Sequence, residues 1–160
     1  MNATHLHLIL NHLPVLGTAF GLGLLLFGLW RRSSELKKTA LGVFVIVALA
    51  AVPVYLTGEP AEDGVESLPG VSKPVIEQHE KAAGVALTGV VVLGVAALGG
   101  LICFRRGRLL PAWFSVSLLA TSMIVSGLMA WTANLGGQVR HTEIRANASL
   151  STPNPAAHHD

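Results

Sequence analysis

Charged residues are missing from four long stretches of this 160-residue chain. The stretches run from Met1 to Trp30, from Thr39 to Gly58, from Ala82 to Phe104 and from Leu109 to Val139, and they contain 30, 20, 23 and 31 residues. About 20 apolar residues in a helix cross a bilayer, because each residue adds about 1.5 Å. We therefore expect an all-α integral membrane protein with four transmembrane helices, at about 6–31, 37–57, 74–104 and 109–135.

The scarcity of charge excludes whole classes of protein. Charged residues make up 12% of the chain, against about 25% in an average soluble domain. This composition excludes a soluble enzyme, a disordered chain and a nucleic-acid-binding domain, and it makes the lipid bilayer the first expected partner. Because Cys103 is the only cysteine, an intrachain disulfide, a c-type haem attachment site and an all-cysteine iron–sulfur site are also excluded.

Glycine and proline suggest where the helices begin and end. Gly58 is a suitable C-terminal cap for the second helix, and Pro60 is expected to stop its continuation. Pro74 fits the first turn of the third helix, where a missing N–H costs nothing. The pair Gly136 and Gly137 is expected to end or bend the fourth helix.

The distribution of basic residues predicts which side of the membrane each connection faces. Residues 31–38 and 105–108 hold seven arginines and lysines and one acid, Glu35. The positive-inside rule places both of these short connections in the cytoplasm. We therefore expect an up-down-up-down bundle over residues 1–145 with both termini outside, followed by a mobile polar tail at 146–160. In a Gram-negative bacterium the membrane would be the inner membrane and the outer face periplasmic.

Small residues four apart allow helices to approach closely in a membrane. Gly17 and Gly21 form one such pair, and Ser122 and Ser126 form a weaker one. We interpret both pairs as internal packing contacts rather than as a specific dimer interface.

Histidines gather at the expected outer face. They belong to three separate segments, and acidic residues stand near them. Imidazole is the commonest metal ligand and the usual axial ligand of b-type haem, and a neighbouring carboxylate can fix the tautomer of a ligating imidazole. The residues concerned are His5, His7, His12, His79 and His141, with Glu59, Glu80 and Glu143 beside them.

Two kinds of site fit these residues. The first and third helices are diagonal in an up-down bundle, so His12 and His79 are expected to face each other and to serve as axial ligands of haem b, with His141 as the substitute. Alternatively, a single transition metal ion is bound, with His5, His7, Glu80 and Glu143 as further candidate ligands. A third interpretation is that the histidines are interfacial polar residues that bind no cofactor.

Three short motifs resemble those of a family of bacterial four-helix predicted membrane proteins that has no established function. Its members tend to open the first helix with His-x-Pro, as at residues 12–14 here, and to place Gly-Gly and a histidine shortly after the fourth helix, as at residues 136–141. His79 is similar to a third recurring histidine. The resemblance covers residues 5–141 and implies a four-helix fold with a histidine-bearing outer face.

The leading functional hypothesis is electron transfer by a small membrane protein with a histidine-based haem b or metal site, near a quinone or a periplasmic electron carrier. The first alternative is a cofactor-free accessory subunit of a larger membrane complex. The second is a proton-linked small transporter or enzyme that uses Glu59, His79 and Glu80. No catalytic residue is assigned, and the sequence leaves open whether the protein is an enzyme.

Overall fold

The computed structural model describes residues 3–66, 68–105, 108–141 and 144–145, and within them every long element is a helix. Four spans are long and apolar enough to cross a membrane, namely Thr4–Trp30, Ser34–Leu56, Lys73–Cys103 and Ala112–Arg140. This confirms the prediction of an all-helical protein with four candidate membrane spans. The helices are α1 (Ala3–Leu10), α2 (His12–Trp30), α3 (Ser34–Leu56), α4 (Gly58–Asp63), α5 (Lys73–Cys103) and α6 (Ala112–Arg140).

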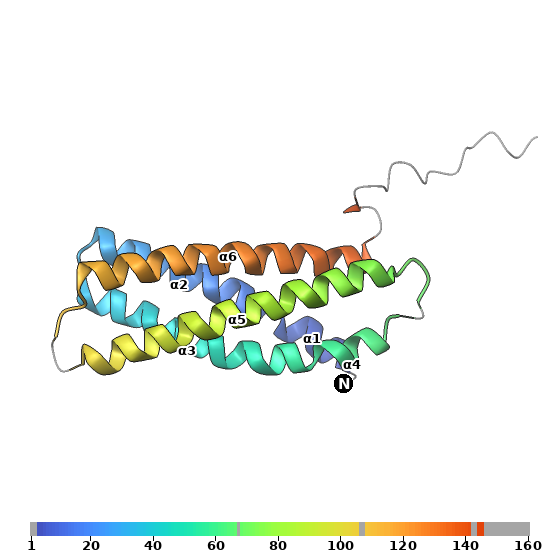
Figure 1. Cartoon of the computed structure of the whole chain (residues 1–160), viewed down its shortest axis with the longest axis horizontal. Helices are drawn as coiled ribbons and strands as arrows, with labels where there is room; N and C mark the ends of the chain where they lie inside the picture. The colour runs from blue at the N-terminus through green and yellow to red at the C-terminus, as the bar shows by residue number, and fades with distance from the viewer. Residues whose placement is uncertain (1–2, 67, 106–107, 142–143, 146–160) are drawn as a thin grey trace, which may run out of the picture.

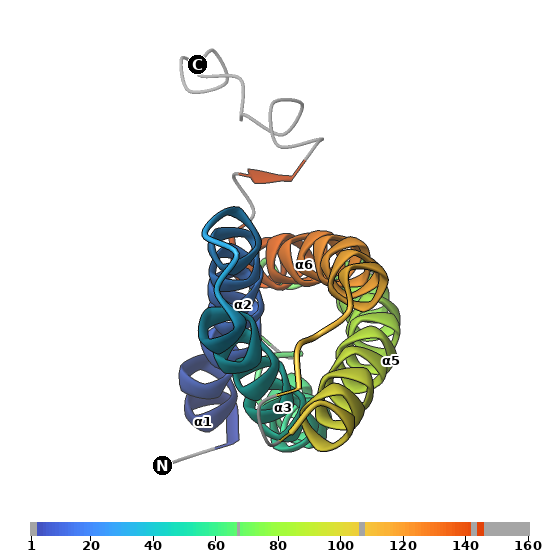
Figure 2. The ribbon, with the colours of Figure 1, turned by 90° about the vertical axis from the view of Figure 1, so that its left-hand side faces the viewer.

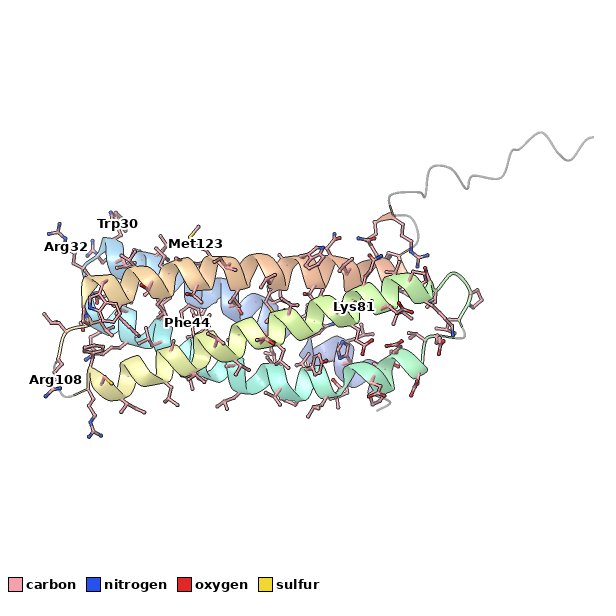
Figure 3. The ribbon with its side chains drawn as sticks, viewed as in Figure 1. Trp30, Arg32, Phe44, Lys81, Arg108 and Met123 are labelled. Atoms are coloured by element: carbon pink, nitrogen blue, oxygen red, sulfur yellow. The ribbon has the colours of Figure 1, made fainter. Side chains whose placement is uncertain are left out.

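The four long helices form an antiparallel bundle. Helices α2 and α5 lie diagonally, and each packs against both α3 and α6 (Figures 1 and 2). The α2–α3 and α5–α6 connections lie together at one end (Figure 1), which we call the basic end after Arg31, Arg32, Arg105 and Arg108. Helices α1 and α4 lie toward the other end, which we call the histidine end after His7 and His79. Figure 3 shows Trp30, Arg32 and Arg108 together at the basic end.

Gly58, Pro60 and the pair Gly136 and Gly137 have other roles than the sequence predicted. Thr57 follows α3, and α4 begins immediately at Gly58 and contains Pro60. Pro60 is tolerated there because a proline in the first turn removes an N–H that has no partner within the helix. Helix α6 likewise continues through Gly136 and Gly137 to Arg140, so the glycine pair does not end it.

The first membrane span is divided into two helices at Asn11. Pro14 lies in the first turn of α2, where its ring nitrogen has no proton to donate to the carbonyl oxygen of Leu10. The ring also crowds that carbonyl, which is a common cause of a helix break. The break separates α1, which packs against α4, from α2, which packs in the bundle.

Glycines set the closest approach between helices. Phe44 of α3 is fully buried, and a methyl group on Gly21 would lie 2.5 Å from its Cε1 atom. A methyl group on Gly17 would lie 2.6 Å from Cγ2 of Val47. Both glycines therefore pack against α3 inside the bundle, which confirms that this pair serves internal packing.

The contact between α5 and α3 at Gly94 supplies a test of this packing. A methyl group on Gly94 would press on Cβ of Ala48 and lie 3.3 Å from the carbonyl oxygen of Phe44. We expect Gly94→Ala to destabilise the bundle by about 1–3 kcal/mol, the usual cost of overpacking. Thermal unfolding of the protein in detergent, followed by circular dichroism, measures the effect as a lower melting temperature.

Gly99→Ala is the matched control on the same helix, since a methyl group there would meet nothing within 4 Å. It should leave the melting temperature unchanged or raise it, because alanine favours a helix over glycine by about 1 kcal/mol. Equal losses in the two variants would contradict the packing role of Gly94.

Candidate functional site at the histidine end

His7 joins α1 to the end of α3. Its Nδ1 atom lies 3.1 Å from the carbonyl oxygen of Val54 and 3.1 Å from Oγ1 of Thr57. The Thr57 hydroxyl itself donates to the Val54 carbonyl oxygen over 2.8 Å. A carbonyl oxygen only accepts hydrogen bonds, so this contact requires the proton of a neutral His7 on Nδ1.

Helix α1 is held in place by α4. The Thr4 hydroxyl donates to the carbonyl oxygen of Ala61 over 3.3 Å, and a methyl group on Gly64 would lie 2.5 Å from Oγ1 of Thr4. Helix α4 follows directly after α3. By holding α1, it fixes the position of His7 against the end of α3. The short helix that the sequence interpretation missed is therefore part of the site.

His79 joins α5 to α6. It is partly buried, and its Nδ1 atom lies 3.0 Å from the carbonyl oxygen of Thr132. Its ring lies against Gly136, where a methyl group would come within 3.0 Å of Cε1. Gly136 therefore leaves room for the close approach of this ring, whereas the sequence suggested that it ends or bends the helix.

The structure places His7 and His79 at the same end of the bundle, His7 against the end of α3 and His79 against α6. Their hydrogen bonds to described residues all use Nδ1. Since both Nδ1 atoms face carbonyl oxygens, both neutral rings carry the proton on Nδ1 and keep the Nε2 lone pair. Two imidazoles of the same tautomer, from α1 and α5, thus form the centre of the candidate site.

His12 lies on the exposed side of α2 with Leu16 and Phe20. Its Nδ1 atom is 2.9 Å from the carbonyl oxygen of Leu8. It is nine residues from Gly21, and at about 100° per residue this separation is roughly half a turn. Because Gly21 faces α3, His12 faces away from α3, and its assignment as an axial ligand stays a prediction.

The remaining predicted ligands are spread over the histidine end. His5 is exposed on α1, and His141 is exposed directly after α6, where its backbone N–H donates to the Gly137 carbonyl oxygen. Glu143 lies outside the described residues. Within the described ranges, no group of three or more His, Cys, Asp or Glu side chains is placed to hold a metal ion. His5, His7 and Glu80 are therefore not gathered into one ligand set there.

Acidic side chains of α4, of the chain after it and of α5 form an acidic surface, which consists of Glu59, Glu62, Asp63, Glu66 and Glu80. Partial burial raises the pKa of Glu62, and the negative charges of Glu80, Glu66, Asp63 and Glu59 raise this pKa further. Lys73 pairs with Glu66 at the same surface. Glu80 is exposed, and its charge acts on Glu62 of α4. The geometry thus associates Glu80 with the acidic surface.

The close contact between Gly136 and the His79 ring can be tested by substitution. We expect Gly136→Ala to displace the ring from Thr132, because the new methyl group would crowd Cε1. The measurement is an NMR spectrum of protein labelled with ¹⁵N-histidine, in which the His79 nitrogen signals should shift.

Gly137→Ala is its neighbouring control, since a methyl group there would lie 3.7 Å from Cδ1 of Ile144, an ordinary contact. It should leave the His79 signals in place. If the His79 signals are unaltered in Gly136→Ala, the close contact between this glycine and the ring is contradicted.

The raised pKa of Glu62 makes stability depend on pH. The folded protein holds this proton more tightly than the unfolded chain, so ionisation of Glu62 lowers stability as the pH rises through and above the ordinary glutamate pKa of about 4.3. Glu62→Gln should therefore raise the melting temperature at neutral pH and leave it unchanged below that pKa. Glu35→Gln, at the basic end, should give no such pH-dependent gain.

Comparisons with protein-family models, with curated proteins and with solved structures found no match for this chain. A proposal for the function therefore rests on the contacts of the chain's own side chains.

Proposed function

We propose that this chain is an integral membrane protein that binds haem b at the histidine end and takes part in electron transfer. The observation that carries the proposal is the pair His7 and His79, two imidazoles at the same end of the bundle whose Nδ1 atoms face backbone carbonyl oxygens. Haem iron in electron carriers commonly takes two protein ligands. A two-histidine pair meets that requirement, whereas small metal ions in proteins are usually held by three or more protein ligands.

The hydrogen bonds of the two rings suit ligation. A ligating imidazole normally donates its other N–H to a carbonyl or carboxylate, which fixes the tautomer and the ring orientation. The Val54 carbonyl with Thr57 would do this for His7, and the Thr132 carbonyl would do it for His79. Gly136 admits the His79 ring, and α4 holds α1 in position. The bound haem would supply one-electron chemistry.

The charge distribution supports an orientation for this activity. Arg31, Arg32, Arg105 and Arg108 lie at the basic end, and the acidic surface lies at the histidine end. By the positive-inside rule the basic end would be cytoplasmic, with the histidine end and both chain termini outside. In a bacterial inner membrane, His7 and His79 would then lie near the periplasmic surface, within reach of a quinone in the outer leaflet or of a periplasmic electron carrier.

The test is a reduced-minus-oxidised absorption spectrum of detergent-purified protein, with metal analysis of the same sample. A Soret band with b-type α and β bands is expected. His7→Ala and His79→Ala should each remove the cofactor or change its spectrum, since each removes one Nε2 ligand. His12→Ala is the matched control from the same span and should retain the wild-type spectrum.

Other outcomes would change the assignment. If His12→Ala lost the spectrum while His7→Ala kept it, the second axial ligand would be His12, as the sequence suggested. A colourless, metal-free protein, after haem loss in purification had been excluded by reconstitution, would contradict the proposal. The accessory-subunit hypothesis would then be tested by co-purification with stoichiometric partners.

A further inference from the structure

A second feature lies at the basic end, far from the histidines. The end of α5 and the chain that follows it border a cavity of about 260 Å³, lined by Ile102, Cys103, Arg105 and Arg108. The backbone N–H of Arg108 donates to the carbonyl oxygen of Arg105 over 3.4 Å. Arg105 and Arg108 thus border the same cavity and are linked by a backbone hydrogen bond.

Neither arginine of this cavity forms an ion pair with a carboxylate of the described residues. Within the described ranges, the one ion pair joins Lys73 to Glu66 at the histidine end. The C-terminal carbonyls of α5 carry a partial charge of about −0.5, which one guanidinium is enough to offset. A second arginine therefore leaves a net positive charge beside an open space. Water occupies about 30 Å³ per molecule, so the cavity has room for a phosphate headgroup.

The surroundings of the cavity are apolar. Ile102 at the end of α5 is 55% exposed, Leu109 in the connection to α6 is 75% exposed, and Trp113 in the first turn of α6 is 69% exposed. Tryptophan is enriched at the level of lipid headgroups. Free phosphate gains nothing from such a surface, whereas the acyl chains of a lipid would cover it.

We infer that the basic end binds one anionic phospholipid, with its phosphate on Arg105 and Arg108 and its acyl chains against Ile102 and Leu109. The guanidinium fork forms paired hydrogen bonds with phosphate oxygens, which gives the site geometric selectivity beyond its charge. This inference does not depend on haem binding, because the site lies at the opposite end of the bundle.

Native mass spectrometry of the detergent-solubilised full chain tests the inference. The probes are phosphatidylglycerol, phosphatidylcholine with the same acyl chains, and inorganic phosphate. We expect one phosphatidylglycerol per chain, bound in preference to phosphatidylcholine. The double variant Arg105→Gln/Arg108→Gln should bind phosphatidylglycerol about tenfold more weakly or worse, since each basic residue near an anionic headgroup contributes about fivefold.

The matched control is Arg31→Gln/Arg32→Gln, which removes the same charge from the same end. It should bind phosphatidylglycerol at least threefold more tightly than the first double variant. Arg105→Lys/Arg108→Lys keeps the charge without the guanidinium fork and should bind with intermediate affinity. Circular dichroism verifies that each variant is folded.

Three results would overturn the inference. Equal losses in the two glutamine variants would mean a general attraction of anions to the basic end. Equal binding of phosphatidylcholine would mean that the phosphate charge is not recognised. Displacement of phosphatidylglycerol by inorganic phosphate at similar concentration would mean that the site binds free phosphate and not a lipid.

Discussion

The free-energy cost of moving a charged side chain into the hydrocarbon of a membrane determines where along this chain charges can lie. No water is present in the bilayer core to solvate an ammonium or a carboxylate, so charged residues collect where the spans end. The four uncharged stretches therefore correspond to the long helices, and the chemistry is confined to the two ends. Within the hydrocarbon, the helices are brought together by shape, through glycines such as Gly21 and Gly94 that let a neighbouring helix approach.

This constraint explains why much of the fold was predictable from the sequence. A run of about 20 apolar residues has few stable conformations other than a membrane-spanning helix, so the spans could be located without knowing their contacts. Helix ends were less predictable, because Gly58 and Pro60 are common in turns and also fit the first turn of a helix. Gly136 was similarly ambiguous, since a glycine can end a helix or make room for a side chain from another helix.

The candidate site was predictable in composition but not in pairing. The histidines were recognised as a group at one end, yet the partner of His79 depends on how each helix is rotated about its axis. That rotation is set by packing, and the contact of Gly21 with Phe44 turns His12 toward the exposed side of α2. Because the chain breaks at Asn11, the rotation of α2 about its axis does not determine the orientation of α1. His7 therefore approaches α3 independently of His12.

The two central histidines and their hydrogen-bond partners together draw on all four membrane spans. His7 belongs to the first span, Val54 and Thr57 to the end of the second, His79 to the third, and the Thr132 carbonyl to the fourth. During biosynthesis the spans enter the membrane in order, so the His7 ring can reach its partners once the second span is present, whereas the His79 ring reaches its hydrogen bond only when the last span has packed. The proposed haem site would therefore be complete only in the fully assembled bundle, and a chain interrupted before its last helix would lack the carbonyl that orients His79.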